Sequence, residues 1–188
     1  MAISLDEQLR ILRVAIEAEV GAPTMILVAS TDDDDGSGLG LGLANAFAAA
    51  GRTTALLRLD AGEQRPAVAL GLRLAELKAE YDVCVIETAR ILESSVALDA
   101  ARIVDGVILV VGMGRRVRRA DRDVVPALSR FGARVLGVVA AEPRRLAELA
   151  AEGAQGVDIV TPGRGSLRVV HGETVPSSTD SHRLVLER

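Results

Sequence analysis

The stretch that decides the fold is residues 24–50, which read TMILVASTDDDDGSGLGLGLANAFAAA. Its first six residues form a continuous apolar run, which is typical of a strand buried on both faces. An acidic, glycine-rich loop follows, and an apolar helix is predicted over residues 41–50, ended by Gly51. A buried strand that leads through such a loop into a helix is typical of α/β proteins with a parallel sheet.

The same alternation continues along the chain. Further strands are predicted at residues 53–59, 83–86, 106–111 and 135–140, with a weaker one at 157–160. Helices are predicted between them, over residues 67–80, 94–102, 118–131 and 144–152. We therefore predict one α/β domain over residues 1–160, with a mostly parallel sheet covered by helices on both faces. Residues 161–188 are broken by glycine and proline, and 167–170 and 184–186 form either short edge strands or part of an irregular tail.

A further helix is predicted before the first strand, over about residues 4–20. Leu5, Leu9, Leu12 and Ile16 fall on one apolar stripe, with charged residues elsewhere. Ser4 is a suitable N-cap for this helix, since a glutamate lies three residues after it.

Composition excludes several classes of function. The 188 residues carry a net charge of −4 and 2% aromatic side chains, so we expect no nucleic-acid partner. No apolar run approaches the ~20 residues of a membrane-spanning helix, and a cytoplasmic location is expected. The single cysteine, Cys84, excludes an internal disulfide and a multi-cysteine metal site. Only one of the 22 basic residues is a lysine, Lys78, so chemistry that requires a lysine must use it.

The loop after the first strand has the position and the glycine content of a phosphate-binding loop. Its charge disagrees with that function, because four consecutive aspartates, residues 32–35, would lie beside a polyphosphate. The lysine that normally reaches the β- and γ-phosphates is also missing. Two alternatives remain open at this point: a solvated acidic loop that caps the helix, and a divalent-cation site with oxygen ligands.

Five segments, in their order and spacing, resemble the cytoplasmic domain of bacterial tyrosine kinases that regulate capsule and exopolysaccharide export. These kinases are deviant-Walker P-loop ATPases, alongside MinD- and ParA-type proteins, and the resemblance covers roughly residues 4–141. The segments are EQLRILR at 7–13, which matches the ring-forming motif E-x-x-R-x-x-R; the strand, loop and helix at 24–51; DAGEQRP at 60–66; the Walker B-like YDVCVIET at 81–88; and DGVILVV at 105–111 with the arginines that follow.

The resemblance implies a nucleotide site in which several groups have changed. Asp35, Gly36, Ser37 and Gly38 correspond to the phosphate-binding loop, with Gly36 or a neighbour in place of the lysine and Ser37 keeping a hydroxyl for Mg²⁺. Asp60 is kept in the second motif, but glycine replaces its second aspartate. These loop and motif residues are therefore expected to be vestigial.

The Walker B-like segment and the acceptor tyrosines have changed as well. Glu87 replaces the Walker B aspartate, so it too is expected to be vestigial. The C-terminal tyrosine cluster of the family is absent, and the only tyrosine, Tyr81, is expected to serve packing. No catalytic or metal-binding residue and no cofactor is expected on this interpretation.

Two functions follow from the resemblance. The first is a degenerate kinase-like protein that acts as an oligomerising interaction or regulatory module in exopolysaccharide biosynthesis or export. Its copies would associate through Glu7, Arg10 and Arg13, and its partners would be a membrane polysaccharide co-polymerase or a catalytically active paralogue. Such a partner would recruit it to the inner face of the membrane. The alternative is an active ATPase or tyrosine autokinase that uses Ser37, Asp60 and Glu87 on Mg²⁺ and ATP.

Overall fold

A computed structural model describes residues 4–22, 24–31, 37–59, 67–88, 90–112, 119–142, 158–160 and 167–168. The helices in these ranges are α1 (Leu5–Glu19), α2 (Ser37–Ala49), α3 (Ala67–Glu80), α4 (Ser95–Ile103) and α5 (Arg119–Arg130). The strands are β1 (Thr24–Ser30), β2 (Thr54–Leu59), β3 (Val83–Thr88), β4 (Gly106–Gly112), β5 (Val135–Ala141), β6 (Asp158–Val160) and β7 (Leu167–Arg168).

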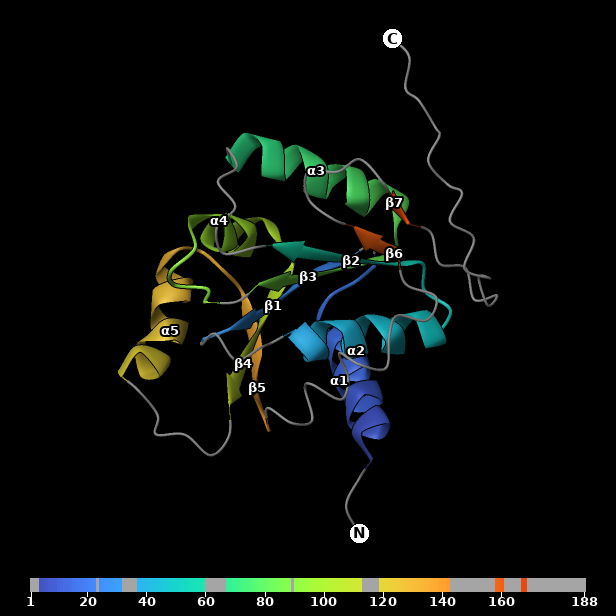
Figure 1. Ribbon diagram of the computed structural model, residues 1–188, viewed down its shortest axis with the longest axis horizontal. Helices are drawn as coiled ribbons and strands as arrows, with labels where there is room; N and C mark the ends of the chain where they lie inside the picture. The colour runs from blue at the N-terminus through green and yellow to red at the C-terminus, as the bar shows by residue number, and fades with distance from the viewer. Residues whose placement is uncertain are drawn as a thin grey trace, which may run out of the picture.

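The described strands form one sheet in the order β5-β4-β1-β3-β2-β6-β7 (Figure 1). Strands β1 to β5 form an all-parallel core in the order 2-3-1-4-5. β6 adds to β2 in parallel, and β7 pairs with β6 antiparallel, so the sheet continues past residue 160. The predicted α/β fold with a mostly parallel sheet is thus confirmed.

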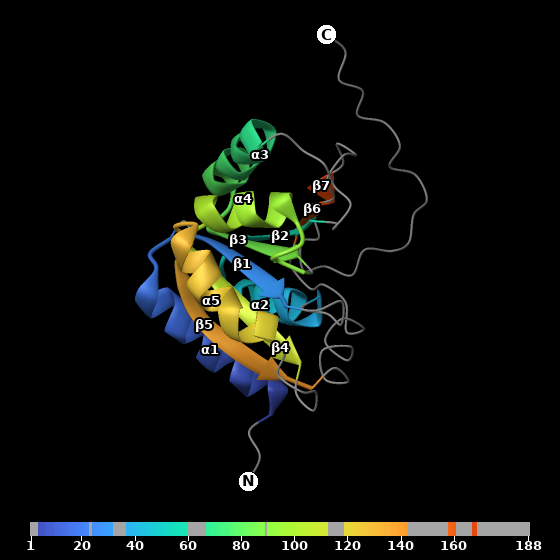
Figure 2. The same ribbon diagram turned by 90° about the vertical axis from the view of Figure 1, so that its left-hand side faces the viewer.

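Helices cover both faces of the sheet (Figures 1 and 2). α1 and α2 pack on one face, where Leu43 and Phe47 of α2 are fully buried with Ile26 and Val28 of β1. α3, α4 and α5 form the layer on the other face. They share a core there with Leu27 and with the other strand residues whose side chains point to that face. Because both faces are covered, all residues of β1 and β3 are buried, as their apolar sequences predict.

The element boundaries agree with the sequence except at one helix. α3 has the predicted bounds, and Gly51 and Gly132 end α2 and α5 with φ of 83° and 82°, a conformation that favours glycine. α2 begins at Ser37, four residues before the predicted start, because its first turns pack against β3 although alternate residues are glycine. The predicted helix at 144–152 and the segment at 184–186 lie outside the described residues.

α1 forms as predicted and packs on α2. The Ser4 side chain caps it by accepting a hydrogen bond from the backbone N–H of Glu7 at 3.3 Å. Leu9 and Ile16 of the predicted stripe are buried, and Leu5 and Leu12 pack partly against the same core. Within the part of the chain that the structure describes, no helix is long and apolar enough to cross a membrane.

Candidate functional site

The candidate site lies beyond the carboxyl ends of the central strands, where parallel α/β sheets bind ligands. β1 ends there at Ser30 and β3 at Thr88, and α2 begins beside them. Ser37 is the first residue of α2, and Gly38 is buried in its first turn. Asp35, Gly36 and Asp60 lie outside the described residues, and so does the aspartate run before them.

Glu87 is the acidic residue that the structure places in this region. It lies in register with Val28 of β1 and Arg58 of β2, so the three side chains share the face that α2 covers. Only 4% of Glu87 is exposed. One carboxylate oxygen, Oε1, accepts a hydrogen bond from the backbone N–H of Leu41 at 3.2 Å, and Oε2 accepts one from Nε of Arg58 at 2.9 Å. Both oxygens of the carboxylate therefore have partners within the chain.

Gly40 of α2 lies directly against this glutamate. A Cβ atom built on Gly40 would stand 2.2 Å from Cγ and 2.4 Å from Oε1 of Glu87, far inside van der Waals contact. The longer side chain of a glutamate thus fits only because the helix residue facing it has no side chain. The Glu87 carboxylate fills the space beside the first turns of α2.

Burial dominates the electrostatics of Glu87. It raises the pKa of this carboxyl from its ordinary value of 4.5 to about 7, although Arg58 and the backbone N–H groups of Leu41 and Gly40 all act to lower the pKa. At neutral pH the group is therefore divided between its protonated and ionised forms.

Lys78 lies at the opposite end of the sheet. Its Nζ is 2.8 and 2.9 Å from the two carboxylate oxygens of Asp105, and one of these oxygens also accepts from the backbone N–H of Met25 at 2.7 Å. Met25 is near the amino end of β1, whereas the candidate loop follows its last residue. The five residues from Met25 to Ser30 span about 16 Å. The only lysine of the chain is thus held away from the candidate site by a structural ion pair.

Tyr81 lies between α3 and β3, where its side chain is 6% exposed. Its backbone N–H donates to the carbonyl oxygen of Leu77 at 2.9 Å, and its ring joins the core between the sheet and α3 to α5. Cys84 in β3 belongs to the same core, and burial raises the pKa of its thiol to about 12. Both residues are packing residues in this structure.

Residues 32–36 and Asp60 lie outside the described residues. Among the described residues, no group of three or more histidine, cysteine, aspartate or glutamate side chains could hold a metal ion. Glu87, the one candidate ligand whose side chain is described, is occupied by Arg58 and by α2.

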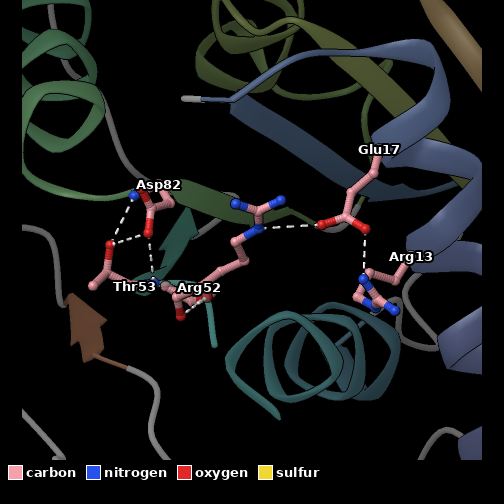
Figure 3. A network of polar contacts seen from close by, with 6 residues as sticks. Arg13, Glu17, Arg52, Thr53 and Asp82 are labelled. Atoms are coloured by element: carbon pink, nitrogen blue, oxygen red, sulfur yellow. Dashed lines mark hydrogen bonds and ion pairs between the residues drawn. The ribbon is translucent and has the colours of Figure 1, made fainter. Parts of the chain in front are cut away.

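The three residues predicted for self-association differ in exposure. Glu7 and Arg10 lie on the outer side of α1, 3.6 Å apart, with about half or more of each side chain exposed. Arg13 is 20% exposed and pairs with Glu17, which in turn accepts from Nε of Arg52 at 3.3 Å (Figure 3). Glu17 therefore ties α1 to the turn after α2, and Arg13 pairs with it within the helix.

A second polar contact lies near this network, at the amino ends of β2 and β3 (Figure 3). The backbone N–H and the hydroxyl of Thr53 donate to Asp82 at 2.9 and 2.8 Å, and the N–H of Asp82 donates back to the Thr53 hydroxyl at 3.0 Å. These hydrogen bonds lower the pKa of Asp82. The contact joins two turns and lies at the end of the sheet that does not bind ligands in this class of fold.

Sequence analysis did not identify Arg58 and Gly40 as site residues. Arg58 is the only charged residue in β2 and lies one position before its end, where a side chain reaches the carboxyl edge of the sheet. That position could have identified Arg58 from the sequence. No feature of the sequence identifies Gly40, because it is one of several alternating glycines and only the position of Glu87 distinguishes it.

Comparison with known proteins identifies solved structures with a similar fold. No model of a protein family matches the sequence, and no curated protein matches it. The kinase domain of Escherichia coli tyrosine kinase ETK is similar with a TM-score of 0.65 at 13% identity, over 74% of this chain and 76% of that one. The VpsO kinase domain gives 0.58 at 22% identity, over 74% and 99% of the two chains.

The MinD cell division protein of Aquifex aeolicus is similar with a TM-score of 0.54 at 12% identity, over 74% of this chain and 83% of that one. The fold that the five sequence segments predicted is therefore confirmed. The chain has the P-loop ATPase-like α/β fold of bacterial tyrosine-kinase domains and of MinD.

Proposed function

We propose that this protein is a non-catalytic, self-associating interaction or regulatory module built on the fold of bacterial tyrosine-kinase domains, with a role in exopolysaccharide biosynthesis or export. The observation that carries the proposal is the state of Glu87. In P-loop enzymes the acidic residue of Walker B and the Ser or Thr of the loop hold the Mg²⁺ ion between them. Here the corresponding carboxylate binds Arg58 and Leu41 instead.

The contact with Gly40 also supports a new assignment of the loop residues. The hydroxyl residue of the G-K-[ST] triplet is the one that meets the Walker B carboxylate, and the residue that meets Glu87 is Gly40. The triplet then corresponds to Gly38, Leu39 and Gly40, with the buried Leu39 in place of the lysine. In this assignment both the lysine and the Mg²⁺-binding hydroxyl are lost, and Ser37 lies before the triplet.

Two further observations support the loss of kinase activity. Lys78 is bound to Asp105 at the far end of β1, so no lysine is available to the phosphates. Tyr81 is the only tyrosine in the chain, and its burial keeps its hydroxyl from acting as a phosphoryl acceptor. An autokinase that modifies its own tyrosines would have no accessible substrate in this chain.

The interaction surface of the proposed module is the outer side of α1. Glu7, Arg10, Ile11 and Val14 are all exposed there, and we refer to them as the α1 patch. Two apolar side chains beside a pair of opposite charges suit a contact between copies of the chain. Membrane polysaccharide co-polymerases and catalytically active paralogues are the further partners proposed, which would place the protein on the cytoplasmic side of the membrane.

The catalytic part of the proposal predicts no turnover of ATP. Incubation with Mg²⁺ and ATP should release phosphate at the same background rate for the wild type and for Glu87→Ala, because the wild-type carboxylate does not act in catalysis. Intact mass should show no added phosphate. Release clearly above the Glu87→Ala rate, or phosphate on Tyr81, would favour the active autokinase instead.

The self-association part predicts that charge reversal in the α1 patch reduces the size of the assembly. Arg10→Glu with Ile11→Glu leaves Glu7 without its partner and places new charge in the contact, at a cost of ~2–5 kcal/mol. Light scattering should then report a smaller species, whereas Phe131→Glu, an exposed position at the end of α5, should leave the size unchanged. Arg13 is not a suitable test position, since it is bound within the fold. A wild-type monomer at high concentration would contradict this part.

A further inference from the structure

The outer face of α3 carries an exposed apolar stripe. Val68 and Leu72 are 75% and 64% exposed, and Ala75 and Ala79 continue the same line. The residues that α3 buries are Leu70, Leu74 and Leu77, on its opposite side. α3 is also the outermost helix of its layer, beyond α4, in both views (Figures 1 and 2). We call these four exposed residues the α3 stripe.

The spacing of the stripe is that of a helix-pairing seam. Its positions are separated by four, three and four residues, which is the a/d pattern by which two helices pack along their length. A helix on a protein surface normally carries polar residues on its outer face. The charged residues of α3 instead flank the stripe, and Arg73 and Glu76 are bound to each other at 3.0 Å.

We propose that the α3 stripe binds the same stripe of a second copy of this chain, with the two helices antiparallel about a two-fold axis. The size of the side chains selects this arrangement. Large residues occupy the amino-terminal half of the stripe and alanines the carboxyl-terminal half. Antiparallel pairing places Val68 against the partner's Ala79 and Leu72 against the partner's Ala75, so large and small residues alternate across the contact.

The flanking charges suit the same arrangement. Reversal of one helix brings each Arg73 close to Glu76 of the partner subunit, so the ion pair seen within one helix can be exchanged across the contact. A parallel pair would place Val68 and Leu72 against themselves and the alanines against alanines. That pairing would crowd one end and leave a gap at the other.

This contact goes beyond the proposed function and does not depend on it. The α1 patch and the α3 stripe lie on opposite faces of the sheet, since α1 and α3 pack into different cores. A two-fold contact through α3 closes on itself and yields a dimer, whereas the α1 patch would join such dimers further. Variants in α1 and α3 can therefore separate the two contacts.

Disulfide cross-linking tests the register. Cys84 is buried and the pKa of its thiol is raised to about 12, so the native cysteine does not compete. A chain with Val68→Cys and Ala79→Cys should form a covalent dimer under mild oxidation. Val68→Cys alone should not, because its two copies would lie ~16 Å apart along antiparallel helices, beyond the ~4.4–6.8 Å that a disulfide spans between Cα atoms. Efficient dimers from Val68→Cys alone, or none from the double variant, would overturn the proposal.

Solution mass provides an independent test. Light scattering of the Arg10→Glu/Ile11→Glu chain should give about twice the 19.7 kDa of one copy, since the α3 contact remains. Adding Leu72→Glu should reduce the mass to that of one copy, with an unchanged circular dichroism spectrum. Ala75→Arg serves the same purpose if Leu72→Glu folds poorly. A monomer before the α3 change overturns the α3 contact and leaves the α1 contact standing, and a mass that neither α3 variant alters overturns it as well.

Discussion

Replacing Gly40 with alanine should destabilise the protein by about 3 kcal/mol, the upper range for one methyl group forced into a packed interior. The new Cβ would stand 2.2 Å from Cγ of Glu87, whose side chain is held between α2 and Arg58. The midpoint of urea unfolding, followed by circular dichroism, measures the change. The effect should appear although alanine is intrinsically the better helix former by ~1 kcal/mol.

Gly71 offers a matched control. It also lies within a helix, but a Cβ there meets only Cδ1 of Ile103 at 3.9 Å, an ordinary contact. Gly71→Ala should therefore be neutral or stabilising. Shortening the opposing side chain by Glu87→Asp should recover part of the loss in Gly40→Ala, with a coupling of ~1–3 kcal/mol between the two changes. Equal stability of the two alanine variants would mean that Glu87 moves aside freely, and the packing described for the site would be wrong.

Replacing Glu87 with glutamine should remove a large part of the pH dependence of stability. The folded protein holds the Glu87 proton more tightly than the unfolded chain, since the pKa is about 7 when folded and 4.5 ordinarily. The unfolded chain thus binds fewer protons between these values, and stability falls as pH rises through that window. From pH 5 to pH 8 the wild type should lose about 2–3 kcal/mol relative to Glu87→Gln.

Urea unfolding at pH 5, 6, 7 and 8 measures this difference directly. Glu19→Gln is the control for the loss of one carboxylate, because Glu19 is 64% exposed and lies outside the candidate site and the α3 stripe. The hydrogen bonds that lower the pKa of Asp82 affect stability only at more acidic pH, outside this window. Parallel profiles for wild type and Glu87→Gln would show that Arg58 compensates fully for the burial of the carboxylate.

Most of the fold could be predicted from the sequence because burial on both faces leaves a strong pattern. The strands of the parallel core are continuous apolar runs, and α3 and the C-cap glycines follow local rules. The start of α2 could not be predicted, because Gly38, Gly40 and Gly42 disfavour a helix locally. Tertiary packing of the buried leucines between them overrides that preference.

The candidate site was predictable in its location but not in its contacts. The order of the strands brings the end of β3, with Glu87, beside α2. Two contacts depend on the register of three neighbouring strands and one helix. Arg58 binds Glu87, and Gly40 leaves the space that the Glu87 side chain fills. The same limit applies to Arg13. Its partner Glu17 is close to it in the sequence, but Glu17 also pairs with Arg52, which lies in another part of the chain.

A calorimetric titration of the wild-type protein with Mg²⁺–ATP tests the proposed non-catalytic role most directly. Glu87 is bound to Arg58 and α2, and Lys78 is bound to Asp105 at the other end of the sheet. We expect no saturable heat of binding up to millimolar ATP. Saturable binding of Mg²⁺–ATP with a low micromolar Kd would contradict a non-catalytic role.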